Sequence, residues 1–252
     1  MGWIEGRVAA RRAWTETHIS LGIEADLPVF EPGQFVRLGL DIDGETVGRP
    51  YSLVNPPGAG LLEVYFDVVP GGPLSPRLAA LAPGDRLRVG SAPYGFMVLS
   101  ELPEGRDLWL LATGTGVGPF VSILESQAAW GRFENLRLVH GVRRASELAY
   151  RDRLLAMEER HGGRFRYLPF VTREACDFAL PGRIPAAIGD GRLAAWAGLP
   201  LDPRHARLML CGNPGMVAGA LEALAPAGFR RHRRREPGQI LLEEYWSEDR
   251  AG

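Results

Sequence analysis

A glycine-rich turn between an apolar run and a helix-like segment is the first place in this sequence that suggests chemistry. The residues DLWLLATGTGVGPF extend from Asp107 to Phe120. Residues 108–112 have the pattern of a buried parallel strand, and residues 119–130 have that of a helix. A strand, a glycine turn and a helix start present backbone N–H groups to a diphosphate, and glycine lets the phosphate approach closely. The segment therefore predicts a dinucleotide site. Pro119 replaces the third glycine of the usual fingerprint, and an ordinary tight turn is the alternative.

Three further segments place reactive or polar side chains at strand ends. Arg49-Pro50-Tyr51-Ser52 closes an expected strand: arginine can neutralise a pyrophosphate, tyrosine can stack on a ring, and serine can donate to a ring atom. The glycine loop 71–73 leads into a short helix with Ser75 as N-cap, and its N–H groups can hold another diphosphate. Cys211-Gly212-Asn213 follows a strand, which puts the cysteine at the carboxyl edge of a parallel sheet, where ligands bind. Each segment alone has a structural alternative: a packed strand, a capped turn or a buried inert cysteine.

The composition is that of an ordinary globular protein. The chain has 252 residues, 46% of them hydrophobic, and a formal net charge of −1, which argues against a general nucleic-acid binder. No apolar run reaches the roughly 18 residues of a membrane span, and no secretory signal pattern is visible. Only Cys176 and Cys211 are present, too few for a disulfide framework or an ordinary iron–sulfur cluster. We therefore expect a cytoplasmic protein with no bound metal, no membrane contact and no nucleic-acid partner.

The order of the predicted elements indicates two domains. Up to about residue 100, short strands separated by proline–glycine turns favour an antiparallel barrel. The expected strands there are 3–8, 14–21, 34–40, 49–54, 61–69 and 85–89, with a helix at 75–81. Later, strands alternate with helices, which is typical of a parallel sheet. These segments are strands 108–112, 136–140, 165–171 and 207–211 and helices 119–130, 150–160, 185–197 and 214–224. We predict a six-stranded antiparallel β-barrel over 1–102 and an α/β domain with a five-stranded parallel sheet over 103–252.

The ordered series of motifs resembles the ferredoxin–NADP⁺ reductase family, especially its bacterial ferredoxin/flavodoxin–NADP⁺ reductases. The series is Arg-x-Tyr-Ser, the glycine-rich serine loop, Gly-Thr-Gly-x-Gly-Pro and Cys-Gly-Asn-Pro, spread over nearly the whole chain. Shorter matches are Trp3-x-x-Gly6-x-Val8, Pro32-Gly33-Gln34-Phe35, Val171-Thr172-Arg173-Glu174, Gly182-Arg183-Ile184-Pro185 and Glu244-Tyr245-Trp246. One such motif alone is weak evidence for the family, whereas the ordered series is specific to it.

The resemblance implies two cofactors, FAD on the barrel and NADP(H) on the α/β domain. It assigns to FAD the residues Arg49, Pro50, Tyr51, Ser52, Tyr65, Phe66, Val68, Leu74, Ser75, Thr115, Tyr245 and Trp246. It assigns to NADP(H) the residues Gly114, Thr115, Gly116, Arg143, Arg144, Thr172, Arg173, Arg183, Cys211, Gly212, Asn213 and Met216. Several arginines suit a 2′-phosphate, because a dianion is well bound by guanidinium forks. Ser52, near flavin N5, and Cys211, beside the nicotinamide, are the expected catalytic positions, in an aligning role.

The implied activity is hydride transfer between nicotinamide C4 and flavin N5, coupled to one-electron exchange with ferredoxin or flavodoxin. Three alternatives stay open: an NAD(P)H-dependent flavin reductase, the reductase component of an oxygenase, and a non-catalytic FAD redox sensor. The basic run from Arg230 to Arg235 is either a solvated face or a docking patch for an acidic electron carrier. We expect a monomer. In bacterial relatives the aromatic pair near the end lies on the FAD adenine, which is the role expected for Tyr245 and Trp246.

Overall fold

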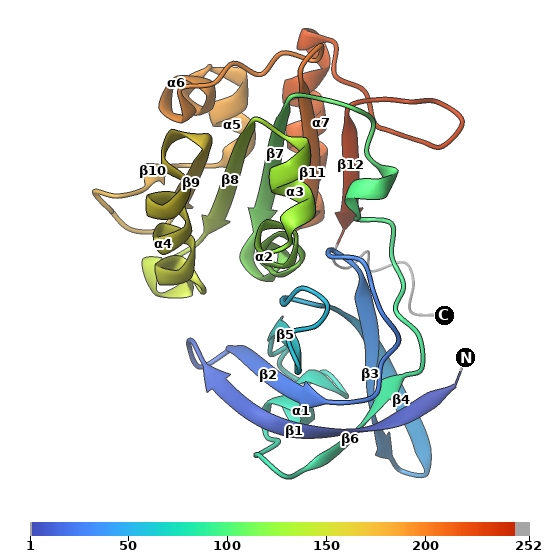
Figure 1. Ribbon diagram of the computed structural model, residues 1–252. Helices are drawn as coiled ribbons and strands as arrows, with labels where there is room; N and C mark the ends of the chain where they lie inside the picture. The colour runs from blue at the N-terminus through green and yellow to red at the C-terminus, as the bar shows by residue number, and fades with distance from the viewer. Residues whose placement is uncertain (1, 245–252) are drawn as a thin grey trace. The chain divides into compact units, whose positions relative to one another are not determined.

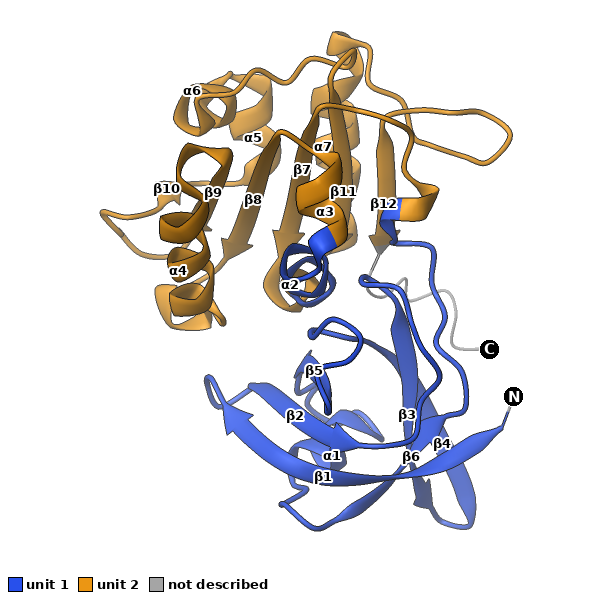
Figure 2. Ribbon diagram, viewed as in Figure 1, with its two compact units in different colours: residues 1–99, 118–127 blue, residues 100–117, 128–252 orange. Residues whose placement is uncertain are grey.

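The computed structural model describes residues 2–244, which divide into two compact units (Figures 1 and 2). Unit 1 is Met1–Leu99 with Gly118–Gln127, and unit 2 is Ser100–Val117 with the residues from Ala128 onward. The segment Gly118–Gln127 therefore groups with unit 1, although it follows the first strand of unit 2 in sequence (Figure 2). The domain boundary after residue 102 stays a prediction.

Unit 1 is built on an antiparallel sheet, as expected from the alternating apolar pattern. Its six described strands are β1 (Trp3–Ala13), β2 (His18–Glu24), β3 (Phe35–Ile42), β4 (Glu45–Ser52), β5 (Leu62–Asp67) and β6 (Arg86–Gly90). They are hydrogen bonded in the order β4-β3-β6-β1-β2-β5. An isolated antiparallel bridge between Leu53 and Val64 joins the two edge strands. The sheet thus closes into a barrel around apolar side chains such as Leu21, Val36 and Leu38, which are fully buried.

Two local predictions in unit 1 are wrong. The expected strand at 14–21 starts only at His18, because Trp14 donates its backbone N–H to the His18 carbonyl (2.9 Å) and begins a turn. Ser75 is not the N-cap of helix α1 (Ser75–Ala79) but its first residue, and Leu74 occupies the cap position. The Ser75 hydroxyl instead accepts a hydrogen bond from the Val69 N–H (2.9 Å), which closes the preceding glycine loop.

Unit 2 contains a sheet in which all neighbouring strands run parallel. Its described strands are β7 (Asp107–Thr113), β8 (Asn135–Val142), β9 (Phe165–Val171), β10 (Leu180–Pro181), β11 (Ala206–Gly212) and β12 (Ile240–Glu244), in the order β10-β9-β8-β7-β11-β12. The sheet has six strands rather than the predicted five; the shortest is the two-residue β10. Because the strands are parallel, their carboxyl ends share one edge.

Helices cover both faces of this sheet (Figure 1). α3 (Gln127–Arg132) and α4 (Arg151–His161) lie on one face, and α5 (Ile184–Gly189), α6 (Arg192–Ala197) and α7 (Pro214–Leu224) on the other. The predicted helix 119–130 is two helices, α2 (Gly118–Glu125) and α3, because the Ser126 hydroxyl and N–H both bond to the Ile123 carbonyl. The predicted helix 185–197 is likewise divided, at Gly191, which has a φ of 80°. No helix within residues 2–244 is long and apolar enough to cross a membrane.

Candidate cofactor sites

The glycine turn after β7 lies directly against the end of β11. Gly114 has a φ of +53°, and a Cβ built on it would meet nothing within 4 Å, so the space beside it is open. A Cβ on Gly116 would lie 2.5 Å from the Cys211 carbonyl oxygen. Only glycine therefore allows this turn to approach the neighbouring strand. The contact brings together two of the predicted motifs, residues 114–116 and residues 211–213.

The end of β11 is fixed by hydrogen bonds as well as by packing. The Asn213 N–H donates to the Thr113 hydroxyl (2.9 Å). The Asn213 side-chain oxygen accepts from the Gly215 N–H (2.8 Å) and caps α7. Cys211 is fully buried at the strand end, and Met216 is buried in the first turn of α7. The Cys-Gly-Asn-Pro segment is thus a rigid strand-to-helix turn with its cysteine at the carboxyl edge.

The predicted arginines gather on the same edge, beyond β8, β9 and β10. The Arg173 N–H donates to the Arg143 carbonyl (2.9 Å), so the loops after β8 and β9 run side by side. Thr172 reinforces this contact, since its N–H and its hydroxyl both donate to the Val142 carbonyl (3.2 Å each). Arg183 precedes α5, just after β10, which pairs with β9. Three strands therefore bring their arginines to one region.

These arginines differ in what already binds them. Arg144 forms an ion pair with Glu174 (3.7 Å). Arg143, Arg173 and Arg183 are exposed and have no ion pair with any residue in the described range 2–244. Three guanidinium groups are thus available to an anion at this edge, which is what a 2′-phosphate requires. The donor set fits NADP(H).

On unit 1 the predicted FAD residues lie at the ends of β4 and β5. Arg49 is exposed and donates one hydrogen bond to the Gly48 carbonyl (2.9 Å), which leaves further guanidinium donors for a pyrophosphate. Tyr51 is half-buried, and its ring packs edge-to-face on Phe66 with centroids 5.4 Å apart. Burial raises the pKa of Tyr51 to about 12, so the phenol stays neutral. Ser52 is buried, and it lies opposite Phe35 of the neighbouring strand β3.

The other residues assigned to FAD are spread more widely. Tyr65 and Phe66 are buried on β5, Val68 follows that strand, and Leu74 and Ser75 are buried at the start of α1. Pro50 is an exposed residue of β4. Thr115 belongs to unit 2, where it is half-buried in the glycine turn. Tyr245 and Trp246 lie outside the described residues.

The structure adds two residues that the sequence motifs did not indicate. His140, on β8, is fully buried and contacts the carbonyl of Gly114 with Nε2 (3.0 Å) and the Tyr167 hydroxyl with Nδ1 (3.2 Å). The histidine inside the apolar run 136–142 is the only feature of the sequence that could have indicated the contact between His140 and Tyr167. The contact ties the predicted dinucleotide loop to the middle of the sheet.

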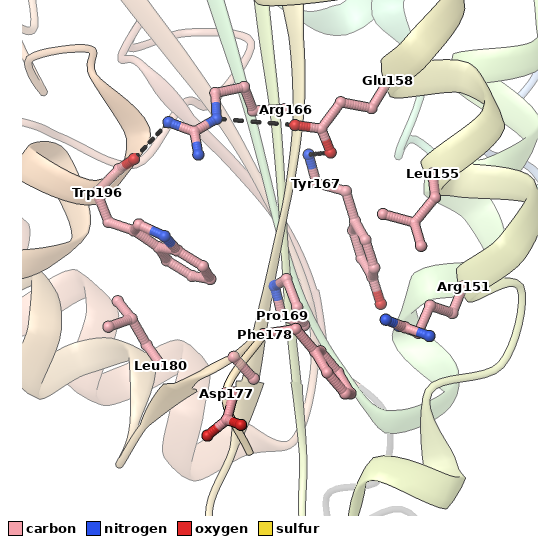
Figure 3. A pocket seen from close by; sticks show the side chains of 11 residues that line it. Arg151, Leu155, Glu158, Arg166, Tyr167, Pro169, Asp177, Phe178, Leu180 and Trp196 are labelled. Atoms are coloured by element: carbon pink, nitrogen blue, oxygen red, sulfur yellow. Dashed lines mark hydrogen bonds and ion pairs between the residues drawn. The ribbon is translucent and has the colours of Figure 1, made fainter.

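A separate cavity of about 350 Å³ lies beside β9 (Figure 3). It is lined by residues of α4, β9, β10, α6 and the loop between β9 and β10, among them Leu155, Tyr167, Phe178 and Trp196. None of its lining residues belongs to the predicted cofactor set. The cofactor residues are instead at the carboxyl edge of unit 2 and on β4 and β5 of unit 1.

Known domain families match both units. Residues 16–98 match the family of oxidoreductase FAD-binding domains, and residues 110–222 match the family of oxidoreductase NAD-binding domains. The closed antiparallel barrel carries the FAD-binding match, and the parallel sheet with its glycine-lined edge carries the NAD-binding match. Together they define a dinucleotide-dependent oxidoreductase with two cofactor domains.

Proteins that are similar to this chain over nearly its full length identify the family within this class. The chain is 45% identical over 245 residues to the flavodoxin/ferredoxin–NADP reductase of Escherichia coli (strain K12), covering 97% of this chain and 99% of the relative. It is 37% identical over 252 residues to the ferredoxin–NADP reductase of Azotobacter vinelandii, covering 96% and 97%. A crystal structure of a ferredoxin NADP⁺ reductase from Neisseria gonorrhoeae with bound FAD and NADP gives a TM-score of 0.91 at 34% identity, covering 96% of this chain and 98% of that one. The chain belongs to the flavodoxin/ferredoxin–NADP reductase family.

Proposed function

We propose that this protein is an FAD-dependent reductase that transfers electrons between NADP(H) and a one-electron carrier, ferredoxin or flavodoxin. The observation that carries the proposal is the carboxyl edge of unit 2, where the glycine turn, the Cys211 turn and three exposed arginines come together. The names of the relatives, similar over nearly their full length, support the same activity. The residues at both sites fit the two cofactors.

FAD belongs to unit 1 in this proposal, within a domain that ends at residue 102. Arg49 would neutralise the pyrophosphate, the Tyr51 ring would stack on the flavin, and the Ser52 hydroxyl would donate a hydrogen bond near N5. Phe66 supports the Tyr51 ring through the edge-to-face contact, so the ring that would hold the flavin is itself fixed. On unit 1, Pro50, Tyr65, Val68, Leu74 and Ser75 are the further residues proposed to hold FAD. Thr115, Tyr245 and Trp246 are assigned to FAD by the family resemblance.

NADP(H) belongs to unit 2. The glycine turn 114–116 binds the diphosphate through its backbone, and Arg143, Arg173 and Arg183 bind the 2′-phosphate, with Arg144 and Thr172 beside them. Cys211 aligns the nicotinamide from the end of β11, with Gly212, Asn213 and Met216 around it. When bound, the two cofactors supply hydride transfer between nicotinamide C4 and flavin N5 and pass electrons singly to the carrier.

The carrier binds, in this proposal, to the basic hairpin between α7 and β12. The segment 230–240 folds back on itself, since the N–H groups of Gln239 and Ile240 both donate to the Arg230 carbonyl. Arg233 and Arg235 lie exposed at its tip. Arg233 forms an ion pair with Glu236 (3.4 Å), and Arg234 is neutralised by Glu101 through two hydrogen bonds (2.6 and 3.1 Å). Dense positive charge on a protein of net charge −1 favours an acidic partner. We place the protein in the cytoplasm as a monomer.

Anaerobic stopped-flow reduction of the purified protein tests the proposal. We expect bound flavin whose absorbance is bleached quickly by NADPH and slowly by NADH. Equal bleaching by both nucleotides would favour a flavin reductase or an oxygenase partner. Bound flavin that neither nucleotide bleaches would favour a redox sensor, and absence of flavin would refute the assignment of unit 1.

A further inference from the structure

We propose that His140 is a positioning residue for the dinucleotide: it orients the Gly114–Thr115 peptide so that the Thr115 N–H faces the bound diphosphate. The inference rests on the proposed function, because it assumes that NADP(H) binds at the carboxyl edge of unit 2. His140 itself is fully buried on β8 and does not reach that edge. Its effect on the nucleotide is exerted through the backbone of the glycine turn.

The imidazole of His140 joins three consecutive strands of the sheet. Nε2 lies 3.0 Å from the carbonyl oxygen of Gly114, the residue that follows β7. Nδ1 lies 3.2 Å from the hydroxyl oxygen of Tyr167, on β9. Since β8 lies between β7 and β9, one buried ring links the glycine turn to the strand on the other side. Both ring nitrogens are therefore engaged.

The chemistry of these groups fixes the direction of both hydrogen bonds. A carbonyl oxygen can only accept, so Nε2 carries the hydrogen and donates to Gly114. In the neutral ring Nδ1 then has no hydrogen and accepts from the Tyr167 O–H. Burial raises the pKa of Tyr167, so its phenol keeps the proton that this bond requires. The Gly114 carbonyl thus selects the tautomer of His140, and the Tyr167 hydroxyl stabilises it by donating to Nδ1.

The bond to Gly114 has a consequence on the opposite side of the peptide. The peptide bond is planar and trans, so the Gly114 C=O and the Thr115 N–H point in opposite directions. With the carbonyl directed at His140, the N–H is directed away from the sheet interior. Gly114 adopts a φ of +53° beside open space. The outward N–H is therefore a donor that a phosphate can reach.

Tyr167 is in turn held in place by its surroundings. Its backbone N–H donates to the Glu158 carboxylate (3.2 Å) on α4. Figure 3 shows its side chain running alongside Leu155, with the hydroxyl end toward Arg151. The phenol is buried, with 4% of the residue exposed, so it cannot leave His140 without repacking. Hydrogen bonds thus connect Tyr167 to His140 and His140 to Gly114, and all three groups are held in fixed positions up to the glycine turn.

The test measures the affinity of the FAD-loaded protein for NADP⁺ and for 2′-AMP by calorimetry. 2′-AMP carries the 2′-phosphate but no diphosphate, so it reports on the arginines alone. We expect His140→Leu to weaken NADP⁺ about tenfold, the effect of one hydrogen bond to a phosphate, and to leave 2′-AMP unchanged. His140→Gln, which has an N–H near the Nε2 position, restores most of the affinity. Tyr167→Phe has a smaller effect, and the double variant with His140→Leu binds no more weakly than His140→Leu alone.

Each other outcome contradicts the inference in a distinct way. If the unaltered protein does not bind NADP⁺, the proposed function fails and the inference with it. If it binds NADP⁺ and His140→Leu binds equally well, the positioning role is wrong. Equal losses for NADP⁺ and 2′-AMP, without rescue by His140→Gln, would show general damage to the fold instead. ¹⁵N NMR of the unaltered protein is independent of any variant: a hydrogen on Nδ1 of His140 would refute the assignment.

Discussion

Removing the Arg173 guanidinium tests the assignment of the 2′-phosphate site directly. Arg173 and Arg143 are held side by side by a backbone hydrogen bond, and both are exposed without an ion pair inside residues 2–244. NADPH carries the 2′-phosphate and NADH does not. We therefore expect Arg173→Ala to lower kcat/KM for NADPH while kcat/KM for NADH stays unchanged.

The size of the effect follows from the exposure of the site. A charge-assisted hydrogen bond to a phosphate is worth up to about a hundredfold when buried, but solvent screening at an exposed arginine reduces this to about tenfold. Because Arg143 shares the same phosphate, the two losses are not additive, and the double alanine variant is expected to lose about 30-fold rather than about a hundredfold. The arrangement of the arginines thus predicts by how much each variant lowers the ratio of kcat/KM for NADPH to kcat/KM for NADH.

Steady-state reduction of ferricyanide with each nucleotide measures that ratio. Arg160→Ala is the matched control, since Arg160 is an exposed arginine in the last turn of α4, toward the opposite edge of the sheet. It should leave both nucleotides unaffected. Equal losses for NADPH and NADH in Arg173→Ala, or no loss for either, would refute the placement of the 2′-phosphate.

Three further predictions concern the glycine turn, the end of the sheet and the basic hairpin. Gly116→Ala places a methyl group 2.5 Å from a carbonyl oxygen of β11, so we expect about 1–3 kcal/mol of lost stability in urea unfolding and weaker NADP⁺ binding. Gly131→Ala, which meets nothing within 4 Å in α3, should be neutral or slightly stabilising, and equal effects of the two would contradict the packing argument. Burial raises the pKa of Glu243 from 4.5 to about 7, so folding stability should fall as pH rises from about 4.5 to about 7. In denaturant titrations, Glu243→Gln should reduce this loss of unfolding free energy by at most about 3 kcal/mol. If the variant loses stability with pH as the unaltered protein does, another group causes the dependence. Arg233→Glu with Arg235→Glu should raise the carrier KM and reduce its salt dependence while NADPH still bleaches the flavin; unchanged carrier kinetics would exclude the hairpin.

The sequence by itself determined the class of each sheet. Alternating apolar residues in the first part and continuous apolar runs such as 108–112 in the second reflect whether one or both faces of a strand are buried. That information is local, so the antiparallel barrel and the parallel sheet were both predicted. The glycine turn was also predicted, because glycine accepts backbone conformations that other residues avoid.

Only the tertiary structure decided which of these local features meet. Arg143 and Arg173 are 30 positions apart, and their adjacency follows from the parallel pairing of β8 with β9. The same pairing puts Tyr167 within reach of His140, although neither side chain stands out in its own segment. The Ser75 prediction failed for a related reason, since its hydroxyl serves the Val69 N–H rather than its own helix. Strand register and side-chain competition depend on contacts between distant segments, and these are settled only when the whole sheet has packed.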